Sequence, residues 1–164
     1  MIRSIILLVL SIFIISCGGE TKKPIAKTET IPLKFENDLP PFPQADMMRL
    51  FEEGTYIDYI FYELPFSISQ DDKPSIHANL KLISSLPLNN LPQGCKPIGR
   101  EFFHIGGEIA YEADLYFTDN CIGYVFLKDQ KPIYGSLVTE EGMKFYSNII
   151  RQSTQISKEK GYAK

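Results

Sequence analysis

The chain has 164 residues, enough for one globular domain with a hydrophobic core of its own. Its 17 Lys and Arg residues against 20 Asp and Glu residues give a formal net charge of −3 at pH 7. Proteins that bind nucleic acid through its phosphates usually carry a basic excess, so this balance argues against a nucleic-acid partner.

The first feature along the chain is an apolar run from Ile5 to Ile15, which follows the positive charge of Arg3. A helix that spans a bilayer needs about 20 apolar residues, so the run is too short to span. It has the length of the apolar region of a secretory signal peptide, which is about 7 to 15 residues. The small residues Ser16 and Gly18 then flank a cysteine, Cys17.

The residues Ile14-Ile15-Ser16-Cys17 resemble the lipobox of bacterial lipoproteins, in which an aliphatic, a variable and a small residue precede a cysteine. The resemblance implies that a signal peptide, residues 1–16, is removed and that the thiol and the new amino group of Cys17 are acylated. Because Gly18 rather than an aspartate follows, it also implies an anchor in the outer membrane, with the protein facing the periplasm. The alternative is an uncut signal anchor, or a buried helix with a chance cysteine.

A proline-rich stretch with scattered charges follows the cysteine. Such a stretch buries too little apolar surface to offset the entropy of ordering it. We therefore interpret residues 17–44 as the lipidated cysteine and a tether to the membrane. The alternative is that the apolar pair Leu33 and Phe35 docks as an edge strand.

A single globular domain is predicted over residues 45–152. The spacing of apolar residues predicts a first helix that ends at Gly54. For residues 55–64 the same spacing, ended by Pro65, favours a second helix, although the tyrosines and isoleucines of this segment would also suit a strand. Residues 75–84 fit a helix and a strand equally well.

The second half of the domain has a clearer pattern of alternating apolar and polar residues with turns between them. Thr139 then fits the cap of a final helix, and residues 153–164 form a polar C-terminal tail. The strands are predicted at residues 101–105, 108–118, 121–127 and 133–138. The predicted fold is α+β: an antiparallel meander of about four strands packed with two to four short helices, one of them C-terminal.

Two cysteines are left once Cys17 is assigned to lipid. Cys95 and Cys121 are an even number of cysteines, and in exported proteins such cysteines are usually oxidised to a disulfide. A disulfide between them would stabilise the fold by up to about 3.5 kcal/mol. The alternative is two buried free thiols.

Few residues suggest catalysis. Glu112 and Asp114 lie two apart on a predicted strand, and glycoside hydrolysis uses a pair of carboxylates. The alternative is that they form the solvated face of that strand. His104 could act as a general base, but it also fits a sheet surface. The spacing of His104, Cys95 and Cys121 does not suit a metal site, and the chain has no motif for a cofactor.

Three tyrosines, Tyr56, Tyr59 and Tyr62, are candidates for a contact surface, since clustered amphipathic rings suit protein or glycan partners. The alternative is that they form the rim of the core.

Three hypotheses of function follow. The first is a non-catalytic, lipid-anchored module of the cell envelope that binds an envelope protein or a cell-wall component. The second is a small cell-wall-active hydrolase of the glycosidase type that uses Glu112 and Asp114. The third, again of the binding class, is an inhibitor or immunity lipoprotein.

Overall fold

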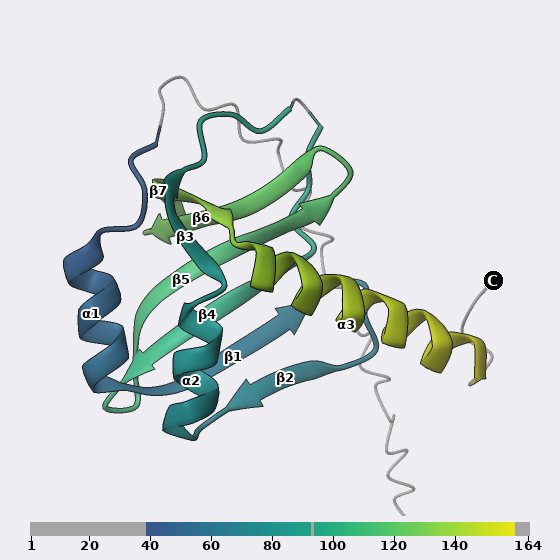
Figure 1. Cartoon of the computed structure of the whole chain (residues 1–164), viewed down its shortest axis with the longest axis horizontal. Coiled ribbons are helices and arrows are strands. Elements are labelled where there is room, and N and C mark those ends of the chain that lie inside the picture. The colour runs from purple at the N-terminus through teal and green to yellow at the C-terminus, as the bar shows by residue number, and fades with distance from the viewer. Residues whose placement is uncertain (1–38, 93, 160–164) are drawn as a thin grey trace, which may run out of the picture.

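The computed structural model describes residues 39–92 and 94–159. The elements in chain order are α1 (Gln44–Glu53), β1 (Gly54–Phe61), β2 (Ser67–Gln70), α2 (Lys73–Leu80), β3 (Ile83–Pro87), β4 (Gly99–Ile105), β5 (Glu108–Thr118), β6 (Cys121–Lys128), β7 (Lys131–Val138) and α3 (Glu140–Glu159). In this part of the chain the strands form one antiparallel sheet in the order β2-β1-β4-β5-β6-β7-β3 (Figure 1).

Strands β4 to β7 form a meander, in which each strand pairs with the next in antiparallel register. They lie where the alternating pattern predicted four strands. The turns between them contain residues with positive φ, namely Gly106, Gly107, Asn120, Asp129 and Gln130. Glycine, asparagine and aspartate reach this conformation more easily than most residues, so the local sequence determines where these turns occur.

The predicted sheet of about four strands is wrong, because three further strands complete it. β1 pairs with β4 and β2 extends that edge, while β3 pairs with β7 at the opposite edge. With 20 residues, α3 is also longer than the short helices expected. The combination of one antiparallel sheet with helices is consistent with the α+β class.

The helix favoured for residues 55–64 is wrong, since most of this segment is β1. Ile57, Tyr59 and Phe61 are buried and alternate with more exposed neighbours, which is the period of a strand. The helical spacing depended on Ile60, but 49% of Ile60 is exposed. The preference of aromatic and β-branched residues for a half-buried sheet therefore decides the structure of this segment.

Residues 75–84, for which a helix and a strand were equally compatible with the sequence, contain part of each. α2 extends to Leu80, and β3 begins at Ile83. The Asp72 carboxylate caps α2 by accepting a hydrogen bond of 3.0 Å from the Ser75 backbone N–H. The helix ends after two turns, and the chain then enters the sheet edge.

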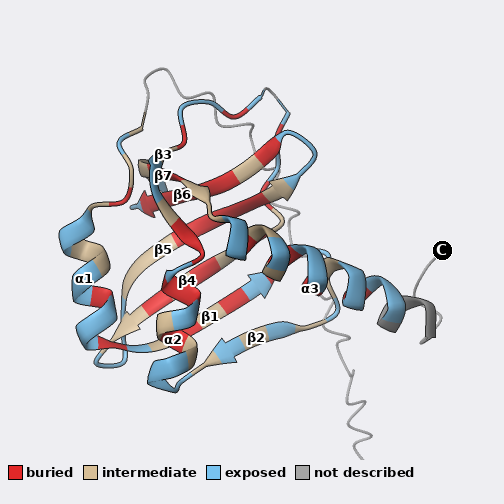
Figure 2. Cartoon of the chain, in the orientation of Figure 1, coloured by how far each residue is buried: buried red, intermediate tan, exposed pale blue. Residues whose placement is uncertain are grey.

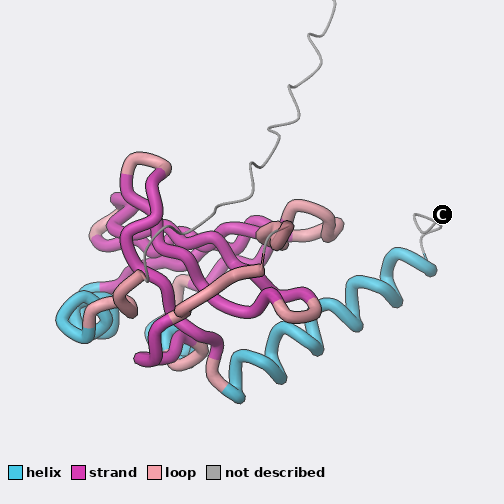
Figure 3. Tube along the Cα trace, turned by 90° about the horizontal axis from the view of Figure 1, so that it is seen from above, coloured by secondary structure: helices cyan, strands magenta, loops and turns pink. Residues whose placement is uncertain are grey.

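All three helices pack against one face of the sheet. Leu50 of α1, Ile76 of α2 and Tyr146 of α3 belong to a single core together with inward-facing residues of the strands. Figure 2 shows these buried positions as red bands along the strands. In Figure 3 α3 passes along one side of the strands, which makes the fold a sheet with one helical layer.

The segment before α1 is part of the fold. Phe42 is 4% exposed and stacks on Phe126 with ring centroids 4.0 Å apart. The Phe42 N–H donates to Ser136 Oγ at 3.0 Å, and the Gly135 N–H donates to the Pro40 carbonyl at 2.9 Å. The predicted tether therefore does not reach residue 44. The signal segment, Cys17 and the pair Leu33 and Phe35 lie outside the described residues.

α3 begins at a capped N-terminus and continues beyond its predicted end. Thr139 Oγ1 accepts a hydrogen bond of 3.2 Å from the Gly142 N–H and donates one of 2.9 Å to the Lys81 carbonyl. The helix extends to Glu159, so residues 153–159, expected to be a tail, are helical. The far end of α3 projects past the sheet (Figure 1).

Among the described residues, those that cover the other face of the sheet lie over β6 and its neighbours. Leu88 and Leu91, from the segment between β3 and β4, pack there on Tyr116 and Val125. Gly123 lies directly beneath Leu88, and a Cβ atom at this glycine would come within 2.7 Å of the Leu88 side chain. This segment therefore fits closely on the second face.

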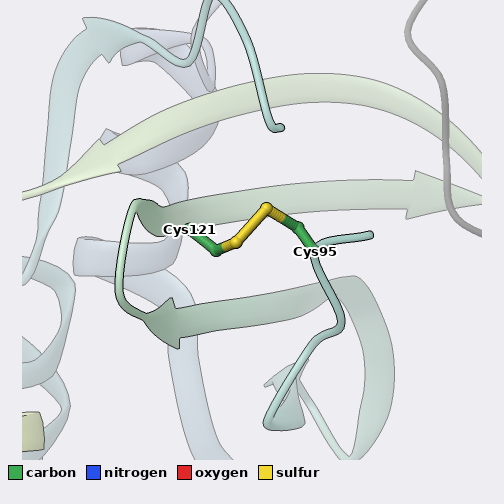
Figure 4. Close-up of a disulfide and its surroundings, with 2 residues drawn as sticks. All are labelled: Cys95 and Cys121. Atoms are coloured by element: carbon green, nitrogen blue, oxygen red, sulfur yellow. A yellow bond between two sulfur atoms is a disulfide. The ribbon is translucent and has the colours of Figure 1, made fainter. Parts of the chain in front are cut away.

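A disulfide holds this covering segment in place. It joins Cys95, at the end of the segment, to Cys121, the first residue of β6 (Figure 4). Both cysteines are buried in the same cluster as Leu88 and Leu91. The bridge therefore ties the segment to the face that it covers.

Among the helices that the structure describes, none combines the length and the apolar character needed to cross a membrane.

Replacing Phe42 tests whether the segment before α1 stabilises the fold. Phe42→Ala should lower the free energy of unfolding by about 3–5 kcal/mol, because it leaves a cavity in the core. Urea denaturation measures this loss. Met48→Ala is the control, since Met48 is half exposed and its removal should change little. Equal stability of the two variants would contradict the docking of Phe42.

Candidate functional site

The candidate site is the half of the second face that the covering segment does not reach and that no other described residue covers. It extends over β2, β1, β4 and β5, and its side chains alternate with residues that point into the core. Tyr62 is 51% exposed and Ile60 49%. We call this surface the open face, and it consists of Tyr56, Asp58, Ile60, Tyr62, Ser67, Ser69, Arg100, Phe102, His104, Glu112 and Asp114.

Arg100 is at the centre of a hydrogen-bonded network on the open face. Its Nε donates to Asp114 Oδ1 at 2.7 Å, and its Nη1 lies 3.4 Å from Glu112 Oε2. The Tyr62 hydroxyl donates to the same Asp114 oxygen at 3.4 Å. Side chains on this face thus join β4 and β5 to each other and to Tyr62, the residue that follows β1.

The turn between β6 and β7 completes the network. Gln130 in this turn accepts a hydrogen bond of 3.1 Å from Arg100 Nη1 and donates one of 3.3 Å to Glu112 Oε1. The amide is therefore placed between the guanidinium and the carboxylate. Arg100 and Gln130 were not singled out from the sequence. Arg100 could have been found, because it directly precedes a predicted strand whose neighbour carries the acids Glu112 and Asp114.

The network shifts the acidity of two of its members. Burial alone lowers the pKa of Arg100, but the hydrogen bond and charge of Asp114 outweigh it, so the pKa is raised. The pKa of Tyr62 is raised by partial burial and by the negative charge of Asp114. Arg100 therefore stays a cation and Tyr62 a neutral hydrogen-bond donor at physiological pH.

Aromatic and polar groups continue the open face toward the other end of β1. The rings of Tyr56 and His104 meet edge to face, with centroids 5.4 Å apart. Asp58 stands opposite Phe102 in the sheet and accepts a hydrogen bond of 2.5 Å from the Ser69 hydroxyl. This half of the face thus combines three rings with one carboxylate.

The three tyrosines proposed as a contact surface divide between the two faces. Tyr56 and Tyr62 lie on the open face, where they are half-buried and exposed respectively. Tyr59 points into the core and is 1% exposed, so it contributes to no surface. The alternation of a strand, which the helical interpretation missed, accounts for this division.

The carboxylates of the hydrolase hypothesis lie side by side on the open face but are engaged with Arg100. Only 6% of the Asp114 side chain is exposed, and Tyr62 and Arg100 both contact its Oδ1. A glycosidase needs two carboxyl groups that reach the sugar from either side of the scissile bond. Asp114 is too buried to reach a sugar in this way. The hydrolase hypothesis stays a prediction that this geometry does not support. His104 contacts Tyr56 and joins no carboxylate in the described residues.

Within residues 39–92 and 94–159, no cluster of three or more His, Cys, Asp or Glu side chains could hold a metal ion. Two of the residues weighed as ligands, Cys95 and Cys121, are bonded to each other instead.

A second polar cluster lies in the core, directly behind the open face. Glu101 is fully buried and accepts a hydrogen bond of 2.7 Å from the Tyr146 hydroxyl, which lies 2.6 Å from the Tyr124 hydroxyl. Burial raises the pKa of Glu101 to about 8, although the hydrogen bond from Tyr146 acts in the opposite direction. The sequence carried a signal for this residue, because Glu101 takes an inward position in its predicted strand.

Comparison of the chain with family models, with curated proteins and with solved structures gives no match. Its function is therefore argued from the site itself.

Removing the centre of the network tests its energetic role. Arg100→Met should lower the free energy of unfolding by about 2–3 kcal/mol, because it leaves the buried Asp114 carboxylate without its cationic partner. Adding Asp114→Leu should recover part of this loss. Urea denaturation of the single and double variants gives the coupling energy.

Arg49→Met is the matched control. Arg49 pairs with Glu53 on the exposed face of α1, so its loss should have no measurable effect. If Arg100→Met were as stable as this control, the network would contribute nothing to the fold.

Proposed function

We propose that the protein is a lipid-anchored, non-catalytic module of the cell envelope that binds a protein partner through the open face. The open face carries the binding part of this proposal. It exposes large side chains such as Ile60 and Tyr62 beside a network of charged and amide groups. A contact surface typically combines rings and apolar groups with polar groups in this way.

Charge indicates the nature of the partner. The open face holds three carboxylates, from Asp58, Glu112 and Asp114, and one guanidinium, from Arg100, so its formal charge is −2. Complementary charge guides specific association and excludes wrong partners. The partner surface is accordingly basic, with apolar groups that cover Ile60 and Tyr62.

Two observations support the location. The N-terminal residues resemble the signal of bacterial lipoproteins, and the bridge between Cys95 and Cys121 is of the kind that persists in oxidising compartments. Residues 17 to 39 are 22 residues apart, which allows a reach of at most about 75 Å from the anchor. A tether of this length would let the open face reach proteins beyond the lipid headgroups.

Metabolic labelling tests the anchor. Cells that express the wild-type chain are fed an alkyne fatty acid, and the protein is expected to take up the label and to sediment with membranes. Cys17→Ala should lose both properties, because it removes the acylated thiol. Ser11→Ala, a change within the apolar run, is the control and should keep both. A Cys17→Ala variant that still sediments with membranes would show that the chain is held by an uncut segment.

Site-specific photo-crosslinking tests the open face. A benzophenone side chain at Tyr62 should form an adduct with an envelope protein, and the same probe at Met48, exposed on α1, should not. Asp58→Arg should reduce the adduct at least tenfold by reversing a charge of the face. Glu53→Arg, a charge reversal on α1, is the control and should leave it unchanged.

The result also identifies the class of partner. An adduct that lysozyme digestion removes would make the partner a glycan, which contradicts the proposal. An adduct equally insensitive to Asp58→Arg and Glu53→Arg would show that the open face is not the binding surface.

A further inference from the structure

The attachment of α3 to the sheet depends on a single polar link beyond its first turn. In the described part of the chain, Thr139 fixes the start of the helix to the residues before β3. After this point, among the side chains that the structure describes, the Tyr146 hydroxyl makes the only hydrogen bonds between α3 and the strands. The other contacts are apolar, through residues such as Phe145 and Ile149.

This link is a chain of three groups. The Tyr146 hydroxyl donates to Glu101 Oε1 at 2.7 Å, and because it has one proton to give, Tyr124 donates to Tyr146 at 2.6 Å. Glu101 lies on β4 and Tyr124 on β6, so Tyr146 bridges two strands that flank β5. The hydrogen bond between the Tyr146 hydroxyl and the Glu101 carboxyl therefore holds α3 on the sheet.

The surroundings of Glu101 disfavour a negative charge. The titratable groups that face it are three phenols, Tyr59 from β1, Tyr124 from β6 and Tyr146 from α3. None of the three ion pairs in the described residues includes Glu101. Glu101 Oε2 and Tyr59 Oη are buried without a hydrogen-bond partner. A carboxylate in this position therefore has no cation and too few donors to compensate its burial.

α3 is also the element that can leave with the least disturbance. The strands are joined by antiparallel ladders, and the disulfide ties β6 to the covering segment. α3 is the last element of the described chain. A groove of about 810 Å³ already lies between α3 and the turn between β5 and β6, with Phe117, Met143 and Ile150 among its walls.

We propose that Glu101 and Tyr146 form a proton-dependent latch, in which α3 is held on the sheet while Glu101 is protonated and is released, with the sheet still folded, when Glu101 loses its proton to water. Release would uncover Tyr124 and Phe117, which α3 now covers. The protein would then present a second, apolar surface on the face opposite to the open face.

The direction of the pH dependence follows from proton binding. With α3 in place the pKa of Glu101 is about 8, and with α3 released the carboxyl meets water and regains a value near 4.5. The closed form therefore binds one proton more than the open form between these two values. Opening is least favourable below pH 4.5, rises about tenfold per pH unit, and levels off above pH 8.

Hydrogen exchange read by mass spectrometry tests the latch on the full chain in detergent micelles. Protection factors, corrected for the intrinsic exchange rate, are compared for peptides from α3 and from β6 between pH 4.5 and pH 8.5. For α3 they should fall by up to about 3,000-fold over this range, while those of β6 stay constant.

Three variants complete the test. Glu101→Gln cannot ionise, so the protection of α3 should become independent of pH. Tyr146→Phe keeps the ring and removes the hydroxyl, so protection should fall at every pH. Glu63→Gln is the control, because this exposed carboxyl should leave the wild-type profile unchanged.

Two outcomes would overturn the proposal. If the protection of α3 in the wild type does not depend on pH, Glu101 does not control the helix. If β6 loses protection in parallel with α3, the proton governs unfolding of the whole domain and no latch exists. Both readings come from the wild-type chain, so they hold even if Glu101→Gln fails to fold.

Discussion

The alternation of side chains along β4 is the constraint on which the structure depends. Arg100 and Glu101 are neighbours in the chain, and a strand must direct them to opposite faces. Arg100 organises the charged network of the open face, and Glu101 meets the tyrosines beneath α3. A register shift of one residue would exchange them, burying a guanidinium among phenols and exposing the carboxyl. The two residues therefore specify the position of β4 in the sheet as strongly as the hydrophobic residues do.

The two faces use polar groups in different ways. On the open face each charged group has a partner, and the network lies near water, so it orders side chains at a modest cost. In the core Glu101 has hydrogen bonds to only one of its oxygens. A buried and partly satisfied carboxyl lowers stability, and a core built for stability alone would hold an apolar residue here. Its presence beneath a helix that packs mainly through apolar contacts is the observation that led us to propose the latch.

The parts of the fold that could be predicted are those in which neighbouring residues decide the structure. The four meander strands follow from strict alternation and from turns such as Asp119-Asn120, where local conformational preference and strand pairing agree. β1 could not be recognised, because its apolar residues fit two periods and only the pairing with β4 and β2 excludes the helix. Phe42 was missed for a different reason, since a lone phenylalanine among prolines has no period at all.

The residue types of the candidate site could be predicted from the sequence, but the contacts between residues from different elements could not. Glu112 and Asp114 were correctly placed on one face, but the sequence could not show that Arg100 and Gln130 converge on them from β4 and from a distant turn. Likewise, three tyrosines three residues apart suggested one surface, and the strand sends Tyr59 inward. Spacing along the chain predicts on which face of a helix or strand a residue lies. Function depends also on the side chains that neighbouring elements place on that face.

The attachment of Pro40 and Phe42 to β6 and β7 determines where mechanical force enters the domain. In a chain anchored by its N-terminus, any pull from the membrane would reach the fold first at the hydrogen bonds to Gly135 and Ser136. These lie on β7, with three strands between them and β1, whose residues form much of the open face. The proposed contact surface is thus separated from the strand that would bear the load, and under the proposed anchoring a pull on the tether would turn the domain without straining the contact.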